Sequence, residues 1–175
     1  HPQKPTSPYG LSKLSVEGYL KFYKEQYGLK SIIFRYGNVF GPRQNPNGEA
    51  GVVAIFNNRL LKGQAPIING DGEQTRDYIF VRDVVNANLL ALKLNGSDTF
   101  NVGTGQETSV NELTHLILEV AESNIDVQTS KKNNFEQRRS SLDCKKLKVS
   151  LNWSPKVSLK EGLSETFIFF KNNGI

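Results

Sequence analysis

Two residues near the N-terminus have the types and spacing of a proton-transfer pair. Tyr9 and Lys13 lie four positions apart in the stretch SPYGLSKLSVEGY, and on a helix this spacing places both side chains on one face. A free tyrosine has a pKa of about 10, too high for a base at neutral pH, and a neighbouring ammonium lowers it. Such a pair can remove a proton from a sugar hydroxyl while hydride leaves the same carbon. The same spacing also occurs among ordinary surface residues.

The element that must position this pair is a helix expected over residues 8–27. Ser7 is a suitable N-cap, Pro8 suits the first turn, and Gly28 ends the pattern. Apolar side chains recur at helical spacing between these ends, at Leu11, Leu14, Tyr19, Phe22 and Tyr23.

Strand and helix patterns alternate along the rest of the chain, which predicts an α/β fold. Strands are expected at 31–36 (as a buried strand), 66–70, 77–80, 99–103 and 126–129, and helices at 52–63, 81–96, 109–123, 143–150 and 158–172. Ser109 with Glu112, and Ser158 with Glu161, have the spacing of capping boxes. The segments 37–51 and 131–140 are expected to be loops.

The composition is that of a water-soluble domain with a modest positive charge. The 175 residues are 37% hydrophobic and carry a net charge of +5, which either attracts anionic ligands such as nucleotides or belongs to an ordinary solvated surface. No apolar run is long enough to span a bilayer, and no signal peptide is visible. The single cysteine excludes an internal disulfide, so we expect a cytoplasmic location and no membrane contact.

A longer pattern surrounds the tyrosine and lysine. The run PTSPYGLSKLSVE (5–17) resembles the active-site helix of extended short-chain dehydrogenases/reductases that act on nucleotide sugars. The stretches 35–56, 70–92, 100–113 and 138–163 resemble later segments of the UDP-glucose 4-epimerases in that family, in the family order. The chain is therefore identified as a member of this family, corresponding to its C-terminal part.

The resemblance implies part of a Rossmann-like fold together with a small α/β substrate-binding domain. Residues 1–50 would supply the catalytic helix and following strand of an incomplete dinucleotide-binding domain. Residues 51–175 would mainly bind the nucleotide sugar, with 77–105 returning to the Rossmann core. The glycine-rich runs at 70–72 and 103–105 lack the pattern of a pyrophosphate loop. We therefore expect the isolated chain to be inactive.

The family pattern also implies roles for the residues that would handle the cofactor, NAD. Tyr9 would be the base, and Lys13 would lower its pKa and bind the nicotinamide ribose. Tyr36 and Val39 would lie near the nicotinamide. The reaction implied is oxidation of the sugar at C4, rotation of the 4-keto intermediate, and return of hydride to its other face. No metal is expected.

A second set of residues would bind the partner molecule, a UDP-sugar. Arg76 can hold a diphosphate with two hydrogen bonds, and the family pattern places Asn38 against the substrate. Val52 and Val53 would line the nucleotide pocket, and Ile68 would lie on the strand that contacts uracil. For Val52, Val53 and Ile68, packing in the core is an equally open interpretation.

One position departs from the family pattern. Related enzymes have an arginine that reaches the diphosphate where this chain has Asn133. Lys131 or Lys132 could replace it after a shift of one residue, but lysine cannot form the same two-pronged contact. Weaker diphosphate binding is therefore expected.

Five other residues are not expected to take part in catalysis or metal binding; of these, His115 is expected to be structural and Cys144 to be a buried thiol. Asp77 and Asp83 occur in contexts that indicate structural hydrogen bonds rather than acid–base catalysis. His1 and His115 belong to no metal-binding pattern, and Cys144 has no reactive neighbour in the sequence.

Three alternatives remain open at this point. The chain could belong to a nucleotide-sugar 4,6-dehydratase or decarboxylase, because the residues that discriminate these enzymes lie upstream of the tyrosine. It could be a non-catalytic module that binds nucleotide sugars or associates with itself as a homodimer. Nucleic-acid binding through the basic run 131–139 is disfavoured, because only Phe135 supplies an aromatic side chain there.

Overall fold

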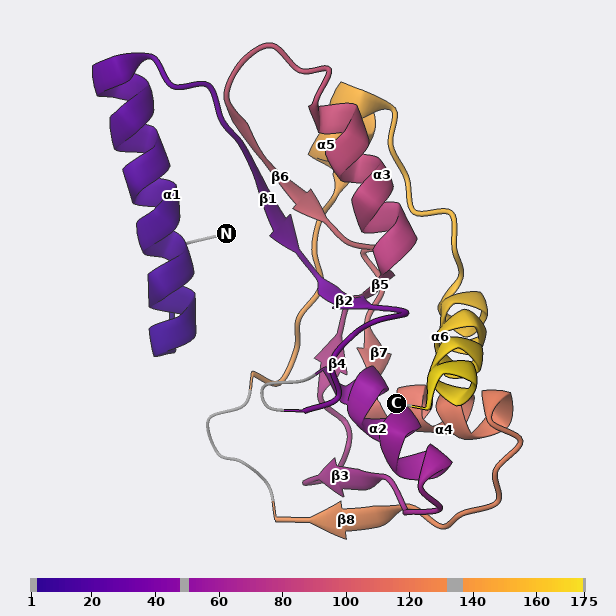
Figure 1. Ribbon diagram of the computed structural model, residues 1–175. Coiled ribbons are helices and arrows are strands. Elements are labelled where there is room, and N and C mark those ends of the chain that lie inside the picture. Colours follow the sequence, from indigo (N-terminus) through magenta and orange to yellow (C-terminus); the bar gives the residue numbers. More distant parts are fainter. Residues whose placement is uncertain (1–2, 48–50, 132–136, 175) are drawn as a thin grey trace.

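The computed structural model describes residues 3–47, 51–131 and 137–174 (Figure 1). The helices are α1 (Pro8–Tyr27), α2 (Val52–Leu61), α3 (Val81–Ala91), α4 (Val110–Val120), α5 (Lys145–Leu151) and α6 (Leu159–Asn173). The strands are β1 (Ile32–Tyr36), β2 (Asn38–Phe40), β3 (Ile67–Asn69), β4 (Thr75–Arg76), β5 (Tyr78–Phe80), β6 (Asp98–Val102), β7 (Thr108–Ser109) and β8 (Gln128–Ser130). The predicted α/β class is confirmed.

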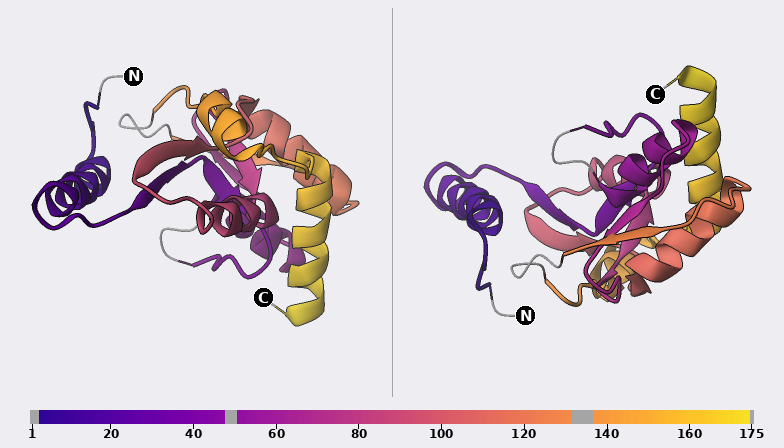
Figure 2. Two further views of the ribbon diagram at one scale, coloured as in Figure 1. Left: turned by 90° about the horizontal axis from the view of Figure 1, so that it is seen from above. Right: turned by 90° about the horizontal axis from the view of Figure 1, so that it is seen from below.

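Helix α1 has the predicted bounds, and its two ends explain why. The Ser7 hydroxyl accepts a hydrogen bond from the Gly10 N–H at 3.1 Å, which satisfies one of the free donors of the first turn. Gly28 adopts a left-handed conformation (φ 67°) and its N–H returns to Lys24, as glycine allows without steric cost. No residue of α1 is buried, and the helix stands beside the other elements in all three views (Figures 1 and 2).

The strand pairs that lie nearest to α1 are parallel. β1 pairs with β6 and β2 pairs with β5, with Gly37 between β1 and β2. The prediction of a loop over all of 37–51 is therefore wrong at its start, because β2 lies within it. Gly37 donates to the Val102 carbonyl, and Asn38 donates to the Asp77 carbonyl. Pairing with a distant strand thus overrides the loop-like composition of this segment.

Two further pairs form at the other end of the molecule. β3 pairs with β8 in parallel, and β4 pairs with β7 in an antiparallel arrangement. The two-residue strands β4 and β7 were not predicted. Helix α3 ends at Ala91 rather than near residue 96.

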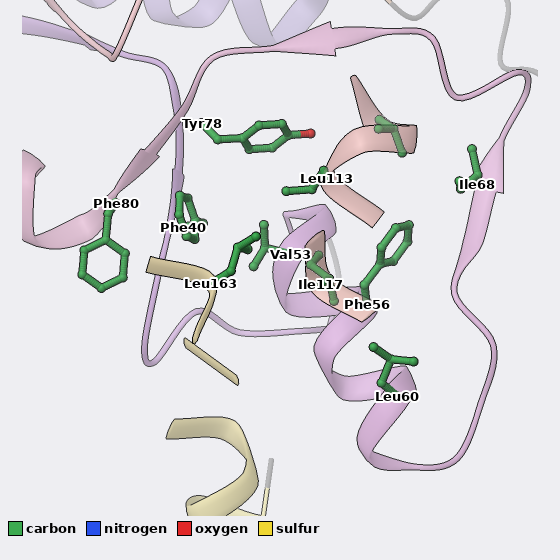
Figure 3. Close-up of a cluster of buried hydrophobic side chains, with 11 residues drawn as sticks. Phe40, Val53, Phe56, Leu60, Ile68, Tyr78, Phe80, Leu113, Ile117 and Leu163 are labelled. Carbon is green, nitrogen blue, oxygen red and sulfur yellow. The ribbon is translucent and has the colours of Figure 1, made fainter. Parts of the chain in front are cut away.

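The first buried cluster lies between α2, α4, α6 and strands β2, β3 and β5 (Figure 3). Its side chains are Phe40, Val53, Phe56, Leu60, Ile68, Tyr78, Phe80, Val110, Leu113, Ile117 and Leu163. Figure 3 shows Val53, Phe56 and Leu60 extending from one helix toward Ile117 and Leu113. α6 is held in this arrangement by the predicted capping box, in which Ser158 and Glu161 bond to each other's backbone N–H.

The second buried cluster connects β5 and β6 to α3 and α5. It contains Ile79, Val84, Ala87, Phe100, Val102, Leu147 and Trp153. The strand predicted at 31–36 is present as β1, but the expectation that it is buried is wrong, since no residue of β1 is fully buried. A cleft of about 500 Å³ lies between α1 and β1, lined by Ile33 and Arg35 on the strand side. Among the described helices, none is both long and apolar enough to cross a membrane.

Candidate active site

Tyr9 and Lys13 lie on one face of α1, as their spacing predicts. The ammonium of Lys13 is 5.2 Å from the centroid of the Tyr9 ring, a distance at which a cation is attracted to the ring. Tyr9 is 67% exposed. The helix thus holds a phenol beside an ammonium and presents the pair to solvent.

A cleft of about 780 Å³ opens between α1 and the segment 137–143. It brings together two of the predicted cofactor residues, Lys13 from α1 and Tyr36 from the end of β1. Arg139 and Asn101 line the same cleft. The Tyr36 hydroxyl accepts a hydrogen bond from Asn88 Nδ2 at 3.0 Å, which fixes the ring at the rim of the strand.

The position of α1 at this cleft depends on an ion pair with β1. Arg35 Nε donates to Glu17 Oε1 at 2.7 Å, and Arg35 Nη2 donates to Glu17 Oε2 at 2.5 Å. The hydrogen bonds from Arg35 hold the pKa of Glu17 below its ordinary value. This two-pronged contact connects the helix of Tyr9 and Lys13 to the strand that ends at Tyr36.

Asn38 and Val39 lie on β2, just after Tyr36 at the end of β1. The Asn38 backbone N–H donates to the Asp77 carbonyl at 2.6 Å, and Asn38 is exposed to solvent. Val39 is half-buried against the second cluster, and its carbonyl accepts from Gln44 at 3.1 Å. The two predicted contacts therefore lie next to Tyr36, one open to solvent and one packed.

Arg76, the predicted diphosphate ligand, lies half-buried on β4. Its Nη1 donates to the carbonyls of Thr75 at 2.8 Å and Gln137 at 2.7 Å. Arg138 contributes to the same contact between segments, because its carbonyl accepts from the Thr75 N–H at 2.9 Å. The guanidinium thus lies where the segment after residue 136 crosses β4.

Two surface ion pairs hold that crossing segment further. Arg138 bonds to Asp71 at 2.7 Å, and Arg139 donates to both carboxylate oxygens of Glu107 at 2.9 and 2.8 Å. The hydrogen bonds from Arg139, followed by one from Thr75, lower the pKa of Glu107 to about 2. Segment 137–139 is therefore fixed by side-chain and backbone contacts together.

The three apolar residues predicted at the nucleotide pocket belong to the core. Val53 is 1% exposed and Ile68 is 5% exposed, and Val52 packs against the same cluster. The side chains of Val53 and Ile68 are buried, so a ligand contact at these two positions would fall to the backbone, whereas Val52 is half-buried. α2 begins at Val52 after Gly51, which offers no side-chain cap.

The expectation that Asp77 and Asp83 make structural hydrogen bonds is confirmed. Both are buried. Asp77 accepts from Thr104, Gly105 and Leu142, and Asp83 accepts from the N–H groups of Lys156 and Val157 at 3.1 Å.

The remaining residues singled out in the sequence lie outside the site. Burial raises the pKa of the Cys144 thiol to about 11, which keeps it protonated. His115 is exposed on α4. His1 and Asn133 lie outside the described residues. Within 3–47, 51–131 and 137–174, no group of three or more His, Cys, Asp or Glu residues could hold a metal ion.

Sequence reasoning missed Asn101 and Arg139 as residues of the cleft. Asn101 lies one residue before the end of β6, and Arg139 lies in the charged run 131–140 that was read as an exposed loop. A signal was available for Asn101, because side chains near the carboxyl ends of neighbouring parallel strands gather at one edge of a sheet. For Arg139 the contacts are non-local, and the local sequence carries no such signal.

Known sequences similar to this chain are sugar-nucleotide enzymes. The model of the NAD dependent epimerase/dehydratase family matches residues 1–103. A putative UDP-glucose 4-epimerase of Methanocaldococcus jannaschii is 48% identical over 99% of this chain and 56% of its own length. A UDP-glucose 4-epimerase of Mycolicibacterium smegmatis is 44% identical over 98% of this chain and 55% of its own. A human dTDP-D-glucose 4,6-dehydratase is 34% identical over 98% and 50%.

Solved structures give the same picture. A Thermotoga maritima UDP-glucose 4-epimerase crystallised with UDP-glucose superposes with a TM-score of 0.95 at 48% identity, over 98% of this chain and 56% of that one. A Thermus thermophilus UDP-glucose 4-epimerase in complex with NAD superposes with a TM-score of 0.90 at 41% identity, over 97% and 56%. The chain spans about half the length of the curated relatives it matches.

Proposed function

The chain belongs to the NAD-dependent epimerase/dehydratase family, and we propose that it supplies the base and much of the sugar-nucleotide site of a UDP-glucose 4-epimerase. The observation that carries this proposal is the likeness to an epimerase crystallised with UDP-glucose, at a TM-score of 0.95 and 48% identity. Two epimerase relatives share 48% and 44% identity with the chain, against 34% for a dehydratase. This difference favours epimerisation over dehydration.

Tyr9 and Lys13 act as the proton-transfer pair in this proposal. The Tyr9 phenolate takes the proton of the sugar C4 hydroxyl, and the Lys13 ammonium stabilises the phenolate. Because Tyr9 holds that proton, it can return it to the oxygen after the 4-keto sugar has turned its other face. The 5.2 Å distance between Lys13 Nζ and the Tyr9 ring supports their joint action.

The residues present fit one end of NAD, which supplies the hydride acceptor and donor when bound. Lys13 and Tyr36 line one cleft of about 780 Å³, large enough for a ribose and a nicotinamide ring. Lys13 would donate to the ribose hydroxyls, and Tyr36 and Val39 would bound the ring. A glycine-rich pyrophosphate loop does not occur in these 175 residues, so this chain would hold the nicotinamide end alone.

The UDP-sugar is proposed to lie across β2, β4 and the start of α2. Arg76 would bind the diphosphate, for which a guanidinium is suited by charge and geometry. Asn38 would donate to the sugar. Val53 and Ile68 would act through their backbone, because their side chains are buried in the core, and the half-buried Val52 would line the nucleotide pocket at the start of α2. The basic balance of the chain, with a net charge of +5, favours such an anionic ligand.

Titration calorimetry with UDP-glucose tests the substrate half of this proposal. The chain should bind UDP-glucose more tightly than dTDP-glucose, and Arg76→Ala should weaken binding about tenfold or more, since hydrogen bonds to charged groups are worth about 1.5–3 kcal/mol. Arg82→Ala is the matched control, because Arg82 is a surface arginine paired with Glu165 on α6. Absence of UDP-glucose binding, or equal losses in both variants, would contradict the proposal.

We also propose that the 175-residue chain by itself does not epimerise UDP-glucose. Tyr9 is 67% exposed and α1 buries none of its residues, whereas catalytic proton transfer gains from a water-excluded, preorganised site. Purified chain supplied with NAD and UDP-galactose should form no UDP-glucose in a coupled assay. Turnover that disappears in Tyr9→Phe would refute this point.

A homodimer in the cytoplasm is the proposed state of the protein. The exposed aromatic side chains of α1 support self-association. The single, half-buried Cys144 suits a reducing compartment.

A further inference from the structure

The carboxylate of Asp77 is buried at the junction of four chain segments. Asp77 is 1% exposed. Its Oδ1 accepts from Thr104 N at 2.8 Å and Thr104 Oγ1 at 2.6 Å, and its Oδ2 accepts from Gly105 N at 3.0 Å and Leu142 N at 3.2 Å. All four of these donors are neutral. The charge is thus stabilised by oriented backbone and hydroxyl dipoles.

The surroundings of Asp77 are shaped to admit this carboxylate closely. A Cβ at Gly37 would lie 2.6 Å from the Asp77 carbonyl oxygen, and a Cβ at Gly103 would lie 2.4 Å from Oδ2. Both approaches are shorter than a side chain tolerates. Glycine at these two positions therefore lets β1–β2 and the end of β6 converge on Asp77.

The segments that meet at Asp77 are those that carry the proposed ligand contacts. Its backbone carbonyl accepts from Asn38, a proposed substrate contact, and Arg76 precedes it in the chain. Leu142 follows the segment 137–139 that Arg76 bonds, and lines the cleft with Lys13. Asp77 thus connects β2, through its backbone carbonyl, to the segment after β6 and the far wall of the cleft, through its carboxylate.

We propose that Asp77 is a positioning residue, whose carboxylate sets the geometry of Asn38, Arg76 and segment 137–142 for binding a nucleotide sugar. This inference rests on the proposed function. A buried charge is costly unless it is fully hydrogen-bonded. Asparagine is neutral and has the same size as aspartate, but it cannot make the same hydrogen bonds. Its NH₂ group would face N–H donors where Asp77 presents an acceptor oxygen.

The test compares Asp77→Asn with Asp83→Asn in the same chain. Asp83 is also buried and also accepts from two backbone N–H groups, but these belong to Lys156 and Val157. Both variants should unfold more readily. Asp77→Asn should also weaken UDP-glucose binding at least tenfold by calorimetry, whereas Asp83→Asn should change it less than twofold.

Amide hydrogen exchange provides a readout that does not depend on ligand. In Asp77→Asn, the amides of Gly105 and Leu142 should exchange faster, because they donate to the carboxylate. The amides of Asn38 and Thr75 should also exchange faster, although they donate to the carbonyls of residues 77 and 138 and not to the carboxylate. In Asp83→Asn, the faster amides should be those of Lys156 and Val157. If Asp77→Asn does not fold, Thr104→Val should give the same pattern at smaller amplitude, because it removes the hydroxyl donor and leaves the three backbone N–H donors to Asp77 in place. The amide of Gln106, whose N–H donates to the same hydroxyl, should also exchange faster in that variant.

The outcomes separate this inference from the function on which it rests. Equal losses of affinity in Asp77→Asn and Asp83→Asn would mean a merely structural role and overturn the inference. If the unmodified chain does not bind UDP-glucose, the proposed function fails. The positioning role of Asp77 is then tested by amide hydrogen exchange alone. Unchanged exchange at Asn38 and Thr75 in the Asp77 or Thr104 variant would then overturn the positioning role.

Discussion

At the scale of single residues, the sequence allowed us to predict pairs that lie close together in the chain, but not hydrogen-bond partners that lie far apart in it. Tyr9 and Lys13 are one helical turn apart, so a short motif was enough to place them together. The structural nature of Asp77 was also predicted from its neighbours. Its partners were not, because Thr104 and Leu142 lie 27 and 65 positions away and the sequence between them does not reveal the contact.

The close approach of Gly103 to Asp77 gives a residue-scale prediction about stability. Gly103→Ala places a methyl group 2.4 Å from a buried carboxylate oxygen, and such overpacking costs about 1–3 kcal/mol. Gly96→Ala is the control, since a Cβ there meets nothing within 4 Å. Urea denaturation should show a lower midpoint for Gly103→Ala and an equal or slightly higher midpoint for Gly96→Ala. Equal midpoints for both variants would disprove the steric argument.

At the scale of elements, a helix or strand could be predicted closely where residues at its own ends mark where it begins and stops. Helices α1 and α6 were predicted closely because Ser7, Gly28 and Ser158 cap them locally. Strand β2 was missed because it lies in a stretch rich in Gly, Pro and Asn, and β4 and β7 were missed because two residues carry too little pattern. β2 pairs with β5, and β4 pairs with β7. These short strands therefore form because of their partner strands and not because of their own sequence pattern.

The ion pair between α1 and β1 gives an element-scale prediction about pH. Arg35 lowers the pKa of Glu17 below its ordinary value of 4.5. Because the carboxyl is more acidic in the folded protein, the pair stabilises the fold above about pH 4.5, and this contribution disappears as the pH falls through the lowered pKa. Glu17→Gln should therefore be less stable than the unmodified chain at pH 7, by up to about 1 kcal/mol for a partly exposed pair. The difference between the two should shrink as the pH falls below about 4.5.

Urea midpoints measured at pH 7, 5 and 3 would follow this convergence. Glu25→Gln is the matched control on the same helix, since Glu25 is exposed and lies 4.0 Å from Lys21. That variant should behave like the unmodified chain at each pH. A constant difference between Glu17→Gln and the unmodified chain across the range would count against a role for the Glu17 charge.

At the scale of the whole molecule, α1 stands out among the described helices because it alone buries none of its residues. Tyr19, Phe22, Tyr23 and Tyr27 are 68%, 51%, 47% and 72% exposed, and Phe22 contacts Tyr23 edge to face with ring centroids 5.8 Å apart. Burying aromatic side chains contributes roughly 25 cal/mol per Å². In a solution of the pure protein, the only molecule that can cover this face is a second copy of the chain. We therefore expect the chain to associate with itself through this face.

The charge of the molecule opposes this association and makes it testable. With a net charge of +5, two copies repel each other, and salt screens that repulsion. Sedimentation should therefore show a monomer–dimer equilibrium that moves toward dimer as salt rises. Phe22→Ser should shift it toward monomer, because it removes an aromatic ring from the middle of the face. Val149→Ser, at a single apolar side chain that is 85% exposed on α5, should leave it unchanged. A monomer at all concentrations, or an equal effect of both substitutions, would mean that α1 does not bind a second copy.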